Sequence, residues 1–146
     1  MSHWPDPVPG LVIRYSYLWR READQGREEG VKDRPCAIVA AVKNDPGGKT
    51  VYVLPITHSM PIDHSEAIEL PQQTKLRLGL DGERSWVIIS EANMFSWPGP
   101  DLCTLPGMGP DSAAYGFLPP RFFKIIRDRF VERGHQGDPG LVTRTE

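Results

Sequence analysis

The sequence of 146 residues contains only two cysteines, Cys36 and Cys103, and no long hydrophobic run. Two cysteines are too few for a disulfide framework, so we expect a reducing, cytoplasmic environment. No apolar run approaches the roughly 20 residues that a membrane span requires, and we expect no membrane partner. The first residues, MSHWPDPVPG, lack the charged start and apolar centre of a secretory signal.

An excess of positive charge is also absent, because the formal net charge is −2. A strongly basic chain would indicate nucleic-acid binding through counterion release, so any RNA or DNA site must depend on local charge. The hydrophobic fraction of 39% and the charged fraction of 25% are ordinary for globular proteins. The chain length suits a single domain with a packed core.

Proline and glycine are abundant, with 15 and 14 residues, and favour short strands and loops over long helices. Segments rich in β-branched, aromatic or aliphatic residues predict strands over 11–19, 35–42, 50–56, 67–70 and 86–91, with a weak one over 101–105. The turn sequence NDPGG at 44–48 joins the second and third of these strands into a hairpin.

Helical patterns are few. Residues 71–78 predict one or two helical turns. Residues 119–132 (PPRFFKIIRDRFVE) carry Phe122, Ile126 and Phe130 at four-residue spacing, which predicts an amphipathic helix. We therefore expect a mainly β fold, a small curved antiparallel sheet or barrel with a C-terminal helix. The expected organisation is an extended arm over 1–9, one domain over 10–133 and a flexible tail over 134–146.

A polar loop over residues 20–32 precedes the apolar strand that begins at Pro35. Loops of this length in compact domains are often functional. Its end, REEGVKDR, gathers opposed charges directly before the strand. One interpretation is a solvated turn in which Arg34 pairs with Asp33 or Glu29. The other is a site that binds phosphate.

The order of several motifs resembles the PemK/MazF family of toxin endoribonucleases over about Gly10 to Arg133. The motifs are PGLVIRYSYLW, the loop and strand GREEGVKDRPCAIV, the strand VYVLPITHS, the strand SWVIISE and the terminal helix. The resemblance implies an SH3-like barrel that forms a homodimer. It also implies a growth-inhibiting toxin that cleaves single-stranded mRNA without a metal, and an antitoxin protein that blocks its groove.

Such cleavage uses the 2′-hydroxyl of RNA as nucleophile and leaves a 2′,3′-cyclic phosphate and a 5′-hydroxyl. The enzyme must accept one proton, stabilise the phosphoryl transition state and assist the leaving oxygen. A guanidinium suits the second task because its fixed donors match phosphate oxygens. The resemblance assigns this role to Arg34 of the Arg-Pro motif, with a hydroxyl hydrogen bond from Thr57 of the Pro-Ile-Thr motif.

The proton acceptor is left open among Glu29, Glu28 and His58. Some members of the family use an Arg-x-Asp pair on the later strand as acid and base. This chain has Ile89-Ser90-Glu91 there, without the arginine, which favours Arg34 as the catalytic arginine. Glu91 and Asn93, at the end of that strand, are interpreted as base-reading groups. The residues that we assign to RNA binding are Lys32, Glu28, His58, Ser59, Glu91 and Asn93.

We expect no metal and no cofactor, because His58, Asp63 and His64 fit no recognised ligand spacing. A different function on the same fold is a non-enzymatic toxin that binds DNA gyrase, or a catalytically silent regulator. Fold analogy does not separate these functions, since function resides in the site. The presence of Arg34 and Thr57 favours the nuclease.

Overall fold

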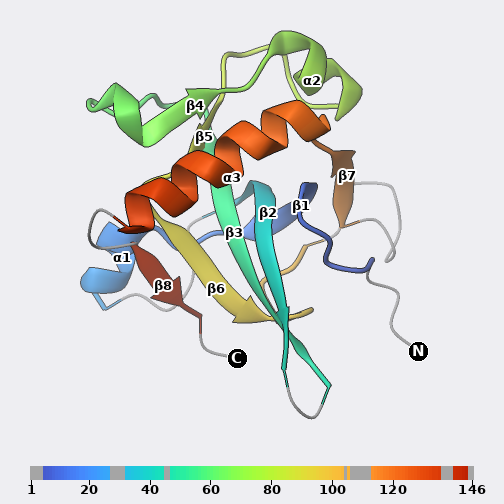
Figure 1. The fold of residues 1–146 in the computed structure, drawn as a ribbon, viewed down its shortest axis with the longest axis vertical. Helices are drawn as coiled ribbons and strands as arrows, with labels where there is room; N and C mark the ends of the chain where they lie inside the picture. The colour runs from blue at the N-terminus through green and yellow to red at the C-terminus, as the bar shows by residue number, and fades with distance from the viewer. Residues whose placement is uncertain are drawn as a thin grey trace.

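A computed structural model describes residues 5–26, 32–44, 47–103, 105, 113–135 and 140–144. Within these ranges the protein is mainly β, with a long C-terminal helix (Figure 1). The elements in chain order are β1 Leu11–Ser16, α1 Arg20–Asp24, β2 Asp33–Lys43, β3 Lys49–Thr57, the 3-10 turn η1 His64–Glu66, β4 Ala67–Glu69, α2 Gln72–Arg77, β5 Trp86–Ile88, β6 Ala92–Ser96, β7 Ala114–Phe117, α3 Pro120–His135 and β8 Leu141–Thr143.

The strands form one eight-stranded sheet in the order β4-β5-β3-β2-β1-β7, and β6 pairs with both β3 and β8. The described ladders are antiparallel except for the parallel pairing of β6 with β8. The sheet is open, because β4 and β7 end the order and are not paired with each other within the described residues. The mainly β class with a C-terminal helix is confirmed, whereas the described strands do not close into a barrel.

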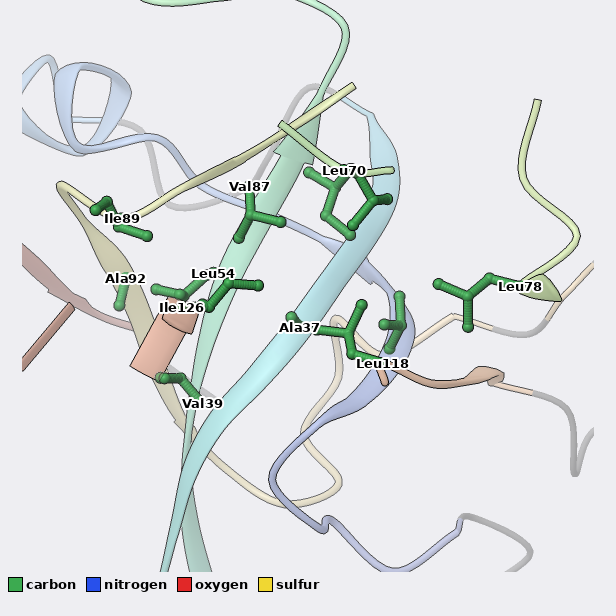
Figure 2. Packing of buried hydrophobic residues seen from close by; sticks show 12 residues of the cluster. Ala37, Val39, Leu54, Leu70, Leu78, Val87, Ile89, Ala92, Leu118 and Ile126 are labelled. Atoms are coloured by element: carbon green, nitrogen blue, oxygen red, sulfur yellow. The ribbon is translucent and has the colours of Figure 1, made fainter. Parts of the chain in front are cut away.

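The β2–β3 hairpin and the terminal helix lie where the sequence patterns predict them. Helix α3 crosses the sheet in front of β2 and β3 (Figure 1). Its Ile126 is fully buried and packs among aliphatic side chains that include Val39, Leu54 and Ala92 (Figure 2). Burial of one such side chain stabilises the fold by about 1.5–3 kcal/mol, so this face of α3 anchors the helix on the sheet.

Of the strand predicted over 86–91, only Trp86–Ile88 is formed, as β5, and the next strand, β6, begins at Ala92 outside the predicted range. The amide of Ile89 donates to the carbonyl of Glu66 at 2.8 Å, which continues the antiparallel register of β4 and β5 by one pair. β3 pairs with both strands, because its first half pairs with β6 and its last two residues pair with β5. The weak strand predicted over 101–105 is reduced to a single bridge between Leu102 and Tyr15.

Two segments predicted as irregular have regular structure. Residues Arg20–Asp24 of the predicted loop form helix α1. The predicted flexible tail is wrong where the chain is described: α3 continues to His135, and β8 then pairs with β6. Burial explains this pairing, because Val142 and Arg144 are 7% and 5% exposed. No helix in the described parts of the chain has the length and apolar character needed to cross a membrane.

Candidate functional site

Arg34 and Thr57 lie just beyond the same end of the β2–β3 ladder. Cys36 pairs with Pro55 and Ala37 with Leu54 across β2 and β3. Continuing this antiparallel register by two residues sets Arg34 opposite Thr57, and directly opposed residues point to the same face of a sheet. Both line one cavity of about 550 Å³. The two residues that the sequence motifs single out therefore meet at one surface.

Arg34 has one buried donor, Nε, without an acceptor among the described residues. Its guanidinium carbon lies 5.0 Å from the centre of the Trp19 ring, a cation–π contact that holds the side chain over the indole. Partial burial lowers the pKa of Arg34, although a guanidinium remains charged at neutral pH. A half-buried guanidinium that lines a cavity suits an anionic ligand.

Thr57 presents a hydroxyl to the same cavity. Its Oγ1 accepts a hydrogen bond from the amide of Ser59 at 3.1 Å, which leaves the hydroxyl proton available for donation. Lys32 and Ser59 line the cavity as well, and both are exposed. They can therefore contact a ligand that extends beyond Arg34 and Thr57.

Glu91 is a partly buried carboxylate on the cavity wall. Its Oε1 accepts hydrogen bonds from the Tyr17 hydroxyl at 3.1 Å and from the Arg20 amide at 2.9 Å. Burial raises the pKa of Glu91, and burial together with the charge of Glu91 raises that of Tyr17, which stays a donor. A fixed carboxylate with a raised pKa is suited to proton transfer as well as to base reading.

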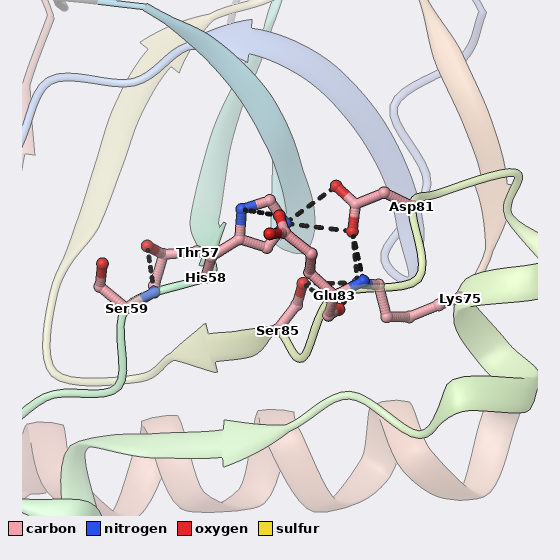
Figure 3. A network of polar contacts seen from close by, with 7 residues as sticks. All are labelled: Thr57, His58, Ser59, Lys75, Asp81, Glu83 and Ser85. Atoms are coloured by element: carbon pink, nitrogen blue, oxygen red, sulfur yellow. Dashed lines mark hydrogen bonds and ion pairs between the residues drawn. The ribbon is translucent and has the colours of Figure 1, made fainter.

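His58 lies in a polar network at another part of the cavity (Figure 3). Its Nε2 is 2.9 Å from Asp81 Oδ2, and its Nδ1 is 3.3 Å from Glu83 Oε2. Both ring nitrogens therefore lie within reach of a carboxylate oxygen. His58 is thereby held by two carboxylates, which makes it less suited to accept a proton from a substrate.

The ammonium of Lys75 completes the network. Lys75 is 1% exposed, and its Nζ donates to Asp81 Oδ1 and Ser85 Oγ at 2.8 Å each and to the Glu83 carbonyl. The hydrogen bond from Lys75 is the main cause of the lowered pKa of Asp81. His58, Asp81 and Glu83 bring possible metal-ligand atoms within 4.8 Å of one another. The ammonium of Lys75, which is bound to Asp81, repels a second cation at this position.

Asn93 is not brought to the cavity. It is fully buried, where its Oδ1 accepts from the Leu18 amide at 2.9 Å and its Nδ2 donates to the Leu18 carbonyl at 2.7 Å. NH1 of Arg144 donates a hydrogen bond to the same Oδ1 at 3.1 Å. Asn93 therefore fixes the segment that carries Trp19 instead of facing a ligand. Sequence reasoning missed this role, because no local motif links Asn93 to Leu18.

The backbone behind Glu91 is tightly packed against Gly140. Gly140 has a φ of +67°, a conformation that favours glycine. A Cβ atom at this position would lie 2.9 Å from the Cα of Glu91. The glycine therefore allows the last strand to approach the cavity wall. Glu28 and Glu29, two of the proposed proton acceptors, lie outside the described residues.

No protein-family model, curated protein or solved structure matches the chain.

Proposed function

We propose that this protein is a metal-independent endoribonuclease that cleaves single-stranded RNA. The observation that carries the proposal is the shared cavity of Arg34 and Thr57, which brings a half-buried guanidinium and a hydroxyl to one concave surface. Phosphodiesters supply acceptors of the required charge and geometry. The function that the motif order implies and the chemistry of the cavity agree.

In this mechanism the 2′-oxygen attacks the adjacent phosphorus while its proton passes to a carboxylate. Glu91 is the described residue suited to accept it, and Glu29 and Glu28 remain further predictions. Arg34 and Thr57 donate hydrogen bonds to the phosphoryl oxygens, where negative charge increases in the transition state. The bond from phosphorus to the 5′-oxygen then breaks, and that oxygen leaves with a proton from solvent or the site. The products are a 2′,3′-cyclic phosphate and a 5′-hydroxyl.

The first prediction concerns Arg34→Ala. Wild-type protein incubated with single-stranded RNA and EDTA is expected to release fragments with cyclic-phosphate ends. Removing the guanidinium is expected to raise the barrier by on the order of 3–4 kcal/mol, which is a loss of several hundredfold in rate. Gel analysis of end-labelled RNA measures the rate, and circular dichroism checks the fold. Arg84→Ala, which removes an exposed arginine paired with Glu69, is the control and is expected to keep full activity.

Undiminished cleavage by Arg34→Ala would show that the site is misassigned. RNA binding without cleavage by the wild type would favour the non-enzymatic toxin or silent regulator instead. Loss of wild-type cleavage on adding EDTA, restored by a divalent ion, would replace the metal-independent mechanism.

The wider PemK/MazF-like description belongs to the same proposal. It comprises an SH3-like arrangement of the strands, a homodimer, a cytoplasmic location and growth inhibition through mRNA cleavage. It also includes neutralisation by a cognate antitoxin protein. The cavity supports this description through Arg34 and Thr57, which a gyrase-binding toxin would not require.

A further inference from the structure

A second cavity, of about 680 Å³, lies where helix α3 begins. Its walls come from the turn before β1, the end of β7, the end of α2 and the first half of α3. It shares no lining residue with the cavity of Arg34 and Thr57. Any ligand at this second cavity is therefore separate from the proposed nuclease chemistry.

The floor of the second cavity is apolar and held by backbone hydrogen bonds. Phe117 and Phe123 line it, and Phe117 is 54% exposed. A Cβ atom at Gly10, whose φ is +95°, would lie 3.7 Å from Phe123 and 3.9 Å from Phe117, so the glycine backbone sits close to both rings. The Gly10 amide donates to Ile38 at 2.8 Å, and its carbonyl accepts from Leu118 at 2.9 Å. The floor is thus preformed.

The rim of this cavity is positively charged. Arg77, Lys124 and Arg127 line it and are exposed. Asp128 forms ion pairs with two of these cations. Its Oδ2 lies 2.7 Å from Lys124 Nζ, and its Oδ1 lies 3.3 Å from Arg127 NH2. Arg77 has no carboxylate partner among the described residues. Three cations therefore face one carboxylate, although the whole chain has a net charge of −2.

We propose that the second cavity binds an acidic peptide segment of a partner protein, with one bulky apolar side chain seated on Phe117 and Phe123. Carboxylates on either side of that anchor meet Arg77, Lys124 and Arg127, so charge complementarity selects the peptide and apolar burial holds it. RNA would also meet the cations. The peptide is favoured because the floor consists of phenyl and proline side chains, which bury an apolar anchor but do not read base edges.

The test uses a defined probe, the acetylated and amidated peptide EDFLDE, titrated into the full chain up to about 2 mM, which detects even weak binding. Amide NMR spectra are expected to show saturable shifts at Gly10, Phe117, Leu118 and Phe123. The charge-reversed peptide KKFLKK and the anchorless peptide EDGSDE are expected to leave these signals unchanged. Absence of saturable shifts with EDFLDE, or equal shifts with KKFLKK, overturns the proposal.

Substitutions test the charged rim and the apolar floor of the second cavity separately. The double variant Arg77→Glu and Lys124→Glu is expected to weaken binding of EDFLDE at least about tenfold through like-charge repulsion. Phe117→Ala is expected to weaken it through loss of the apolar contact. Arg129→Glu changes an exposed cation of the same helix that does not line the cavity, and it is expected to bind as the wild type does. Equal loss in Arg129→Glu, or tighter binding of a short single-stranded RNA at these same residues, contradicts the peptide assignment.

Discussion

At the scale of single residues, the first cavity combines a half-buried guanidinium, a hydroxyl and a carboxylate whose pKa is raised by burial. These groups differ in how far they depend on the surrounding fold. Arg34 and Thr57 come from strand ends, whereas Glu91 is fixed by Tyr17 and by the Arg20 amide. Their contributions can therefore be tested by separate substitutions.

Thr57→Val removes the hydroxyl and keeps the β-branched shape. Loss of one donor to the transition state is expected to lower the rate of RNA cleavage by on the order of 100-fold. Single-turnover cleavage assays measure this rate, and Thr57→Ser, which keeps the hydroxyl, is the control. Equal losses in the valine and serine variants would indicate a packing role for Thr57 instead.

Glu91→Gln removes the charge and retains an oxygen that can accept from Tyr17 and the Arg20 amide. Because burial raises the pKa of Glu91, the folded protein holds this proton more tightly than the unfolded chain. The free energy of unfolding of the wild type is therefore expected to fall, relative to that of Glu91→Gln, as the pH rises from the ordinary glutamate range through the raised pKa. Urea denaturation at several pH values measures the difference.

The same substitution tests proton transfer. If Glu91 is the base, wild-type cleavage increases over that pH range as the carboxylate ionises, and Glu91→Gln is slow throughout. A rate for Glu91→Gln that equals the wild type at all pH values would assign proton transfer to Glu29 or Glu28. The stability difference would persist in that case, since it depends only on burial.

The resemblance in motif order singled out Arg34 and Thr57 as a pair, and both line the first cavity. The sequence did not reveal the role of Asn93, which depends on hydrogen bonds to Leu18 across 75 residues. The cation–π contact of Trp19 with Arg34 was missed for a similar reason. Such contacts arise from strand pairing, which local patterns do not encode.

At the scale of elements, strand β8 links the end of the chain to the cavity. Arg144, directly after β8, is 5% exposed and donates from NH1 to the Ser16 carbonyl at 2.7 Å. Its NH2 lies 2.9 Å from Asp101, and its NH1 reaches the same Asn93 oxygen that holds Leu18. β8 therefore supports the segment that positions Trp19.

Arg144→Ala is expected to lower the free energy of unfolding by about 3–5 kcal/mol, because it leaves the buried partner groups unsatisfied. Chemical denaturation measures this loss. Arg129→Ala, at an exposed position of α3, is expected to change stability by less than about 0.5 kcal/mol. Similar stability of both variants would show that β8 and Arg144 contribute little to the fold.

Elements with strong local signals were predictable. The β2–β3 hairpin has a turn sequence and apolar strands, and α3 has a regular apolar spacing. β6 and β8 were missed because each depends on partners far away in the chain. The expected barrel is not closed because β4 and β7, at the two ends of the sheet order, are not paired with each other within the described residues.

At the scale of the whole molecule, the proposed function predicts a homodimer. Light scattering at micromolar protein concentration is expected to give twice the chain mass of 16.4 kDa. A monomeric mass across the concentrations at which RNA is cleaved would show that one chain suffices for activity. Arg34→Ala serves as the control for folding and is expected to remain dimeric.

The close approach of Gly140 to Glu91 has a consequence for genetic screens. On the proposed function, expression of the protein inhibits growth. A library that samples every amino acid at every position, selected for survival of the expressing cells, is then expected to be enriched in inactivating changes. Almost any replacement of Gly140 is expected among the survivors, because a Cβ atom there would clash with the backbone of Glu91. Few replacements of the exposed neighbour Leu141 are expected among them. A single glycine near the end of the chain would then stand out as sharply as the residues of the cavity itself.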